Sequence, residues 1–279
     1  MDLDGDGNTD ILSGSYSRHG QDMAGLFQVL RGRKDGTFAA AEVLNGADGQ
    51  PLLLPVSGSD DDVDIDRICT RAFAADLDGD EKLDLVSGNF RGAFALFAGQ
   101  GGGRFDPRAT WLQSDGHDVH VDYHGDPFLV DWNSDGDLDL LSGSSKGGAF
   151  LFPNGGSRTA PSFGRRTTLV EPVGESVESD ALGDGHLTGP GSDTRLWAAD
   201  LNGDAKLDLL LGDNVTLYHA QDGVSADVAQ EKLRAWRAAV AELDPEAEDW
   251  GDRYGQLEKQ REPFVREDRT GFVWVLYRK

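Results

Sequence analysis

The sequence predicts an all-β fold, a β-propeller of four repeat units with a helical hairpin inserted in the last blade. Two observations predict this fold. A 13-residue acidic pattern occurs four times, at residues 2–14, 76–88, 131–143 and 200–212, and short apolar runs separated by Gly-rich turns flank the copies. Such runs are typical of strands and hairpins. Repeated four-stranded antiparallel units are typical of propellers.

The units span about residues 1–70, 71–125, 126–194 and 195–279 of a single domain. In each complete unit we expect one strand before the acidic loop and three after it. The first unit begins inside its loop at Asp2, with no strand before it, so we expect the set of blades to be incomplete. A fragment, a misassigned start or the tail of a longer protein would each produce such a beginning.

Residues 225–262 differ from the repeats, because they are rich in Ala, Glu, Arg and Lys and carry apolar residues at helical spacing. Ser225 can cap a first helix at about residues 226–243. Asp244 followed by Pro245 predicts a second helix at about residues 245–260. The apolar run 271–277 then resembles the third strands of the other units. The segment is therefore predicted to be a helical hairpin that packs beside the last blade.

Composition excludes several classes of partner. Asp and Glu number 50 against 26 Lys and Arg, which gives a net charge of −24. Nucleic acids and anionic membranes need a basic face, so neither is expected as a partner. No apolar stretch is long enough to insert into a membrane. The start of the chain has no signal peptide, but we expect the full-length protein to be extracellular, periplasmic or on the cell surface.

The acidic loops have the chemistry of a cation site. Counted from the first Asp of each loop, carboxylate or carboxamide oxygens recur at positions 1, 3, 5 and 9. Two carboxylates about 4 Å apart repel by roughly 4 kcal/mol at an effective dielectric of 20. Ca²⁺ accepts six to eight oxygens in flexible geometry, whereas Mg²⁺ demands a stricter octahedron. The pattern therefore predicts calcium, in up to four sites.

The residues at positions 7 and 12 show which kind of calcium-binding loop the pattern can form. Position 7 includes Lys82 and Lys206, whose side chains cannot bind a cation, so position 7 would contribute its backbone carbonyl. An EF-hand needs a bidentate Glu at position 12 and a following helix. Here position 12 is Ser or Leu and a strand-like run follows, which excludes an EF-hand. Ser134 replaces the Gly found at position 4 of the other copies, and we expect strain in that turn.

The repeated pattern, an Asp-rich loop followed by two apolar residues and a Gly, resembles the FG-GAP/VCBS repeat family of integrin α-chain propellers and many secreted bacterial proteins. The resemblance implies that positions 1, 3, 5 and 9 are side-chain calcium ligands. The candidate metal-binding residues are Asp2, Asp4, Asp6, Asn8, Asp10, Asp76, Asp78, Asp80, Lys82, Asp84, Asp131, Asn133, Asp135, Asp137, Asp139, Asp200, Asn202, Asp204, Lys206 and Asp208.

Three other groups of residues resemble known functional sites. Asp118, His120, Asp122 and His124 would share one face of a strand, but residues four apart in a strand lie about 13 Å from one another, which favours a solvated face over a zinc site. Gly143–Gly147 matches G-x-S-x-G, but it occupies a hairpin rather than the strand-to-helix turn of a nucleophile elbow. The acidic run at residues 60–66 favours a solvated loop, with an extra cation site as the alternative.

Three functions remain open. The first is a calcium-stabilised binding or adhesion module with a protein or carbohydrate ligand. The second is a secreted polysaccharide lyase or hydrolase, which needs a convergent acid/base pair. With 50 acidic residues the sequence does not select such a pair, so a binding module is preferred over an enzyme and no catalytic residue or further cofactor is assigned. The third is a scaffold that spaces the domains of a longer protein. The fold does not decide among them.

Overall fold

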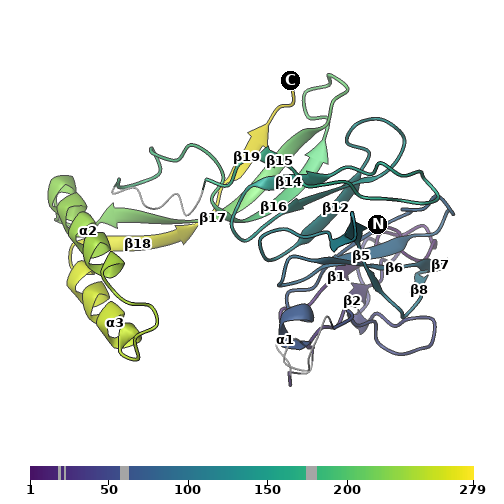
Figure 1. Ribbon diagram of the computed structural model, residues 1–279, viewed down its shortest axis with the longest axis horizontal. Helices are drawn as coiled ribbons and strands as arrows, with labels where there is room; N and C mark the ends of the chain where they lie inside the picture. The colour runs from purple at the N-terminus through teal and green to yellow at the C-terminus, as the bar shows by residue number, and fades with distance from the viewer. Residues whose placement is uncertain (18–19, 22, 57–62, 174–180) are drawn as a thin grey trace.

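The computed structural model describes residues 1–17, 20–21, 23–56, 63–173 and 181–279. Its strands form four main sheets that follow one another in chain order, which confirms the predicted propeller arrangement (Figure 1). We call these sheets blades 1 to 4. The strands of blade 1 are β1 (Ile11–Ser13), β2 (Gln28–Leu30) and β3 (Glu42–Val43). Those of blade 2 are β4 (Arg71–Ala75), β5 (Asp84–Gly88), β6 (Phe94–Phe97) and β9 (Thr110–Trp111).

The second half of the chain forms blades 3 and 4. Blade 3 consists of β12 (Asp126–Val130), β13 (Asp139–Gly143), β14 (Ala149–Phe152) and β15 (Thr167–Val170). Blade 4 consists of β16 (Ser192–Ala199), the first part of β17 (Asp208–Ala220) and β19 (Val273–Leu276). All neighbouring strands within the blades are antiparallel. The smaller elements are α1 (Val63–Asp66) and the hairpins β7 (Gly99–Gly101) with β8 (Arg104–Phe105) and β10 (Gln113–Ser114) with β11 (His117–Asp118).

Three apolar layers hold the blades together, one at each junction between consecutive blades. Side chains alternate along a strand, so neighbouring residues of β5 enter different layers. Leu85 packs toward blade 1, whereas Val86 packs toward blade 3. In β13, Leu140 packs toward blade 2 and Leu141 toward blade 4. We call the side of a blade that meets the next blade its forward face, and the opposite side its backward face.

The Gly at position 13 of the acidic pattern lets consecutive blades approach closely. A Cβ on Gly88 would lie 2.0 Å from the carbonyl oxygen of Gly125, and one on Gly143 would lie 2.2 Å from that of Thr194. Gly125 directly precedes the first strand of blade 3, and Thr194 lies in the first strand of blade 4. A Cβ on Gly212, in blade 4, would meet no atom of the described structure within 4 Å.

This difference gives a matched pair of substitutions. Gly88→Ala is expected to destabilise the fold by roughly 1–3 kcal/mol, because the new methyl group overlaps backbone that cannot rotate away. Gly212→Ala is expected to change the free energy of unfolding by less than about 0.5 kcal/mol. Urea unfolding of both variants measures the effect. Equal losses of unfolding free energy in the two variants would show that the close approach of the blades is not the reason for the Gly at position 13.

The insertion in blade 4 differs from the sequence-based expectation in two respects. Its helices are α2 (Ala226–Ala241) and α3 (Trp250–Arg261), so the second helix begins at Trp250 and not at Pro245. The Asp244 side chain accepts a hydrogen bond from the Glu246 amide at 3.0 Å, and the Asp244 carbonyl accepts one from Ala247, which closes a separate turn before the helix. Ser225 caps α2 as predicted, accepting a hydrogen bond from the Val228 amide at 3.4 Å.

The helices also do not pack beside the blade. The outer part of β17 pairs with β18 (Val265–Thr270) and forms a ribbon that extends away from the blades, with α2 and α3 at its far end (Figure 1). We call the ribbon and the two helices the arm. Tyr218 and Val265 of the ribbon form an apolar cluster with Ala229 and Leu233 of α2. The ribbon therefore covers the apolar helix face that we expected the blade to cover. No helix in the described residues is long and apolar enough to span a membrane.

Candidate functional site

The second, third and fourth acidic loops join the first two strands of their blades, the first loop precedes β1, and all four adopt the same local structure. In each loop, the side chain at position 1 accepts hydrogen bonds from two or three of the amides at positions 4 to 6. The side chains at positions 3 and 5 accept from the amide two residues later. In the fourth loop, for example, the Asp204 amide donates to Asn202 at 2.8 Å and the Lys206 amide donates to Asp204 at 2.9 Å. Asp and Asn favour such turns because their short side chains reach their own backbone. The loop shape is therefore encoded locally.

Positions 4 and 6 of the loops have left-handed backbone, which favours Gly. Ser134, at position 4 of the third loop, has φ 64°. A residue other than Gly is strained in this conformation, as expected for that turn. Position 6 holds Glu81 in the second loop and Ala205 in the fourth, with φ 65° and 66°. Neither residue is among those singled out above from the sequence. Alignment of the four loops would have found them, because Gly occupies position 6 in the other two.

The Asp at position 9 is buried in every loop and ties three parts of its blade together. One oxygen of Asp139 accepts from the Trp132 amide at 3.0 Å, at position 2 of its own loop, and the other accepts from the Asn154 amide at 2.7 Å, after the third strand. The bonds recur in the other blades, with donors Leu3 and Gly32 to Asp10, Leu77 and Gly99 to Asp84, and Leu201 and Arg278 to Asp208. We call this pair of hydrogen bonds to the position-9 carboxylate the latch. It gives position 9 a structural role that was not predicted from the sequence.

Two of the loops bring three carboxylates together. The groups are Asp2, Asp4 and Asp10 in the first loop, and Asp76, Asp78 and Asp84 in the second, with one oxygen from each residue within 4.8 Å of the others. Oxygens bound to one Ca²⁺ at 2.3–2.6 Å can lie up to about 5 Å apart, so the spacing suits this ion. In the third and fourth loops position 3 is Asn133 and Asn202, so positions 1, 3 and 9 together carry one carboxylate fewer in each.

The position-5 carboxylates Asp6 and Asp80 do not belong to these two groups. Asp80 instead contacts the ammonium group of Lys82 at 2.5 Å. The lysine side chain at position 7 therefore pairs with a loop carboxylate, and its backbone carbonyl stays the only group that position 7 could offer to a cation.

Burial makes two of the latch carboxylates costly to ionise. Burial raises the pKa of Asp84, and the charges of Asp78 and Asp80 raise it further. Burial also raises the pKa of Asp139, with a contribution from Asp135. A group whose pKa is higher in the folded state contributes stability below its unfolded pKa and loses it as the pH rises through the folded value. At neutral pH the ionised carboxylates therefore destabilise the metal-free fold, and a bound cation would offset that cost.

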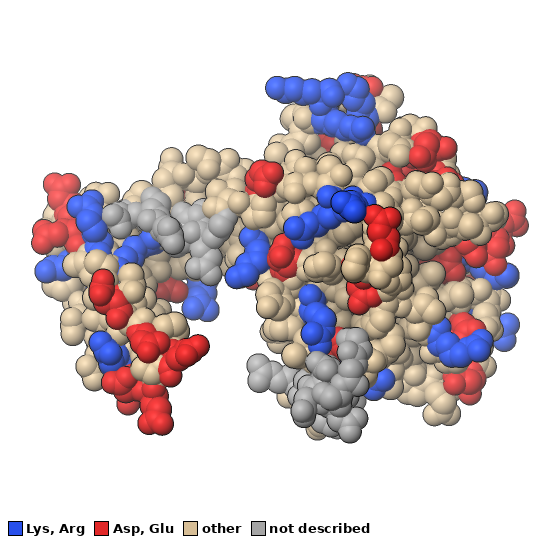
Figure 2. All heavy atoms as spheres, in the orientation of Figure 1, with Lys and Arg blue, Asp and Glu red and all other residues tan. Residues whose placement is uncertain are grey.

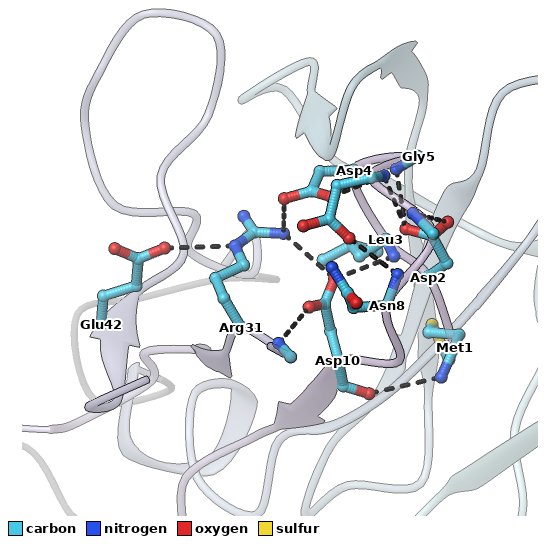
Figure 3. A network of polar contacts seen from close by, with 12 residues as sticks. Met1, Asp2, Leu3, Asp4, Gly5, Asn8, Asp10, Arg31 and Glu42 are labelled. Atoms are coloured by element: carbon cyan, nitrogen blue, oxygen red, sulfur yellow. Dashed lines mark hydrogen bonds and ion pairs between the residues drawn. The ribbon is translucent and has the colours of Figure 1, made fainter. Parts of the chain in front are cut away.

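An arginine contacts the grouped carboxylates of both the first and the second loop: Arg158 lies 3.3 Å from Asp76 of the second loop, whereas Arg31 contacts two carboxylates of the first. The guanidinium of Arg31 lies 3.3 Å from Asp4 and 3.4 Å from Asp10, and it also contacts Glu42 (Figure 3). The first loop therefore already contains a positive charge between two of its three grouped carboxylates. In the other blades the residue at this place, before the latch donor of the third strand, is Ala98, Pro153 or Tyr277.

The other constellations from the sequence are separate from the loops. Asp118, His120 and Asp122 are exposed as expected, but the strand β11 ends at Asp118, and Tyr123 and His124 have left-handed backbone. The chain turns there to enter blade 3, so the predicted continuous strand was wrong. Residues 143–147 form the hairpin turn between β13 and β14, as predicted. Of the acidic run, Asp60, Asp61 and Asp62 lie outside the described residues. Asp66 is buried at the end of α1 and contacts Arg91 at 3.0 Å, so this end of the run is not the solvated loop that we expected.

One comparison with known proteins, a family model, supports the repeat. Residues 76–142, from the second acidic loop into β13, match the family model of the FG-GAP-like repeat. No curated protein matches the chain. Among solved structures, a chain of the Photorhabdus luminescens Tc holotoxin pore with the mutation TccC3-D651A is 17% identical, with a TM-score of 0.38. That match covers 78% of this chain and 10% of the toxin chain, so this chain corresponds to about a tenth of its length.

Proposed function

We propose that this protein is an interaction module whose four acidic loops each bind one Ca²⁺. One observation supports the proposal most strongly. All four loops have the same shape and carry oxygen-bearing side chains at the same positions, and in two of them three carboxylates lie within 4.8 Å of one another. These carboxylates repel one another in the metal-free protein. The net charge of −24 adds to the attraction for cations.

The ligands would be the side chains at positions 1, 3, 5 and 9 and the backbone carbonyl at position 7. The turns already orient positions 1, 3 and 5, and the latch orients position 9. Bound Ca²⁺ would neutralise the carboxylates and hold the loop rigid at the end of the blade. The first site is expected to be the weakest, because Arg31 already pairs with Asp4 and Asp10.

The partner of such a module would be a protein or a carbohydrate outside the cytoplasm. Extracellular calcium modules work with dissociation constants of about 10⁻⁴–10⁻³ M, which exposed loops with few carboxylates suit. The face seen in Figure 2 carries acidic and basic side chains interspersed with uncharged surface, and acidic side chains gather at the lower end of the arm. This distribution favours neither a nucleic acid nor an anionic membrane as partner.

Calorimetric titration of the purified chain tests the proposal. We expect four Ca²⁺ per chain, with one site weaker than the others, and no comparable heat from Mg²⁺. Arg31→Ala is expected to strengthen the weakest site, whereas Arg253→Ala, on the exposed surface of α3, removes the same charge far from the loops and is a matched control. Glycan and protein arrays probed with and without calcium then identify the partner. Absence of Ca²⁺ binding at 5 mM would overturn the proposal, about fivefold above the weakest dissociation constant expected.

A further inference from the structure

The forward face of blade 4 is apolar and uncovered in the described structure. Trp197 is 57% exposed, Val273 is 70% exposed and Tyr277 is 60% exposed. Leu210 of β17 lies between Trp197 and Val275 in the sheet, because it pairs with Trp197 of β16 on one side and with Val275 of β19 on the other. The face consists of Trp197, Leu201, Leu210, Val273, Val275 and Tyr277. Such a patch, rather than scattered single residues, marks an interaction surface.

The same positions are covered in the other blades. At position 2 of the loop, Leu3, Leu77 and Trp132 are at most 7% exposed, whereas Leu201 is 42% exposed. In the innermost strands, Phe73 contacts Phe128 edge-on at 5.1 Å, and Phe128 contacts Trp197 at 4.9 Å. Trp197 is the last ring of this row and has no ring beyond it in the described residues. Gly212 likewise meets no backbone, unlike Gly88 and Gly143.

The three internal junctions show what kind of surface covers a forward face. In each, the cover is the backward face of the next blade, and Leu85, Phe97 and Trp111 provide it in blade 2. Blade 1 carries apolar residues at the same three register positions, Ile11, Leu30 and Val43. Ile11 is 43% exposed, so the backward face of blade 1 is also uncovered.

We propose that the forward face of blade 4 binds the backward face of blade 1 of a second copy of this chain. The contact continues the internal junctions, since it brings together the positions that already meet three times within one chain. It is head-to-tail, so two different surfaces of each copy take part. Such an interface closes into a ring if the rotation per copy permits it and extends into chains if it does not. Repulsion between two copies of charge −24 opposes it, so salt is expected to strengthen association.

Sedimentation velocity and light scattering on the purified chain test this proposal, in calcium and in chelator. We expect the wild type to form species of at least two 30.1 kDa chains, with Trp197→Asp and Ile11→Asp each weakening association by at least about tenfold, as truncation of a central apolar contact does. Val228→Asp, on the exposed surface of α2, is the matched control and is expected to associate like the wild type. Each of the mutated side chains is exposed in the single chain, so the variants should keep the native circular dichroism spectrum.

Mixing the two variants identifies the orientation. Trp197→Asp keeps a functional blade 1 face and Ile11→Asp keeps a functional blade 4 face, so the mixture should form a two-chain species that neither variant forms alone. Association that depends on Trp197 but not on Ile11 would indicate face-to-face pairing and overturn the proposal, as would a monomer at all concentrations up to solubility. Calcium content is expected to be equal in both variants, so a failure here is distinguishable from a failure of the calcium sites.

Discussion

Chelation of calcium is expected to lower the melting temperature of this protein more than any single substitution in a loop. Ligand that binds only the native state stabilises it by roughly 2.7 kcal/mol per site at one hundred times the dissociation constant. For a chain of this size each kcal/mol raises the melting temperature by roughly 2–4 °C. Each occupied site therefore contributes roughly 5–10 °C. Differential scanning calorimetry in excess chelator, followed by back-titration, measures the loss.

The choice of ion and of variant sharpens this measurement. Ca²⁺ should restore the melting temperature and Mg²⁺ should not, because the smaller ion demands an octahedral set that these loops do not offer. Asp78→Ala should remove one site's share of the stabilisation in calcium, with little effect in chelator. Asp252→Ala, an exposed carboxylate on α3 of the arm, removes the same charge outside the loops and should leave the calcium response unchanged. Superimposable melting curves in chelator and in calcium would contradict the calcium sites.

Asp139→Ala is expected to destabilise the protein even without calcium. The substitution leaves the buried amides of Trp132 and Asn154 without their acceptor. Each unpaired buried amide costs about 1–3 kcal/mol, so the loss is roughly 2–6 kcal/mol. The lower end is expected at neutral pH, because burial raises the pKa of Asp139 and its ionised form is itself costly there.

Asp135→Ala, in the same loop, distinguishes the structural role of position 9 from the proposed calcium binding. Asp135 is exposed and its carboxylate accepts from the Asp137 amide at 3.0 Å. Its loss is expected to change stability by less than about 0.5 kcal/mol in chelator, as for most surface substitutions. In calcium, both variants should lose the stabilisation of the third site. Urea unfolding in the two buffers gives all four values. Equal behaviour of the two variants in chelator would show that the latch is not structural.

The repeat, the loop donors and the alternation of the strands could all be predicted from the sequence. Asp at positions 1, 5 and 9 and a Gly at position 13 recur in every copy, and the turns of the loop depend only on bonds between near neighbours in the chain. The helical period of residues 226–241 likewise depends on local spacing, which is why α2 was found close to its true bounds. Local chemistry is readable without knowledge of which distant segments meet.

The tertiary structure alone decided which segments meet. The latch of Asp139 joins residues 15 positions apart, and Arg31 reaches its loop from the end of β2. The arm leaves the blade because β17 continues past Gly212 and pairs with β18. The spacing of apolar residues in the sequence does not distinguish this long strand from a strand that ends in an ordinary turn. Equivalent positions, such as Leu77 and Leu201, are buried in one blade and exposed in another. Burial of a side chain depends on the neighbour that covers it, and a residue's own type and spacing do not specify that neighbour.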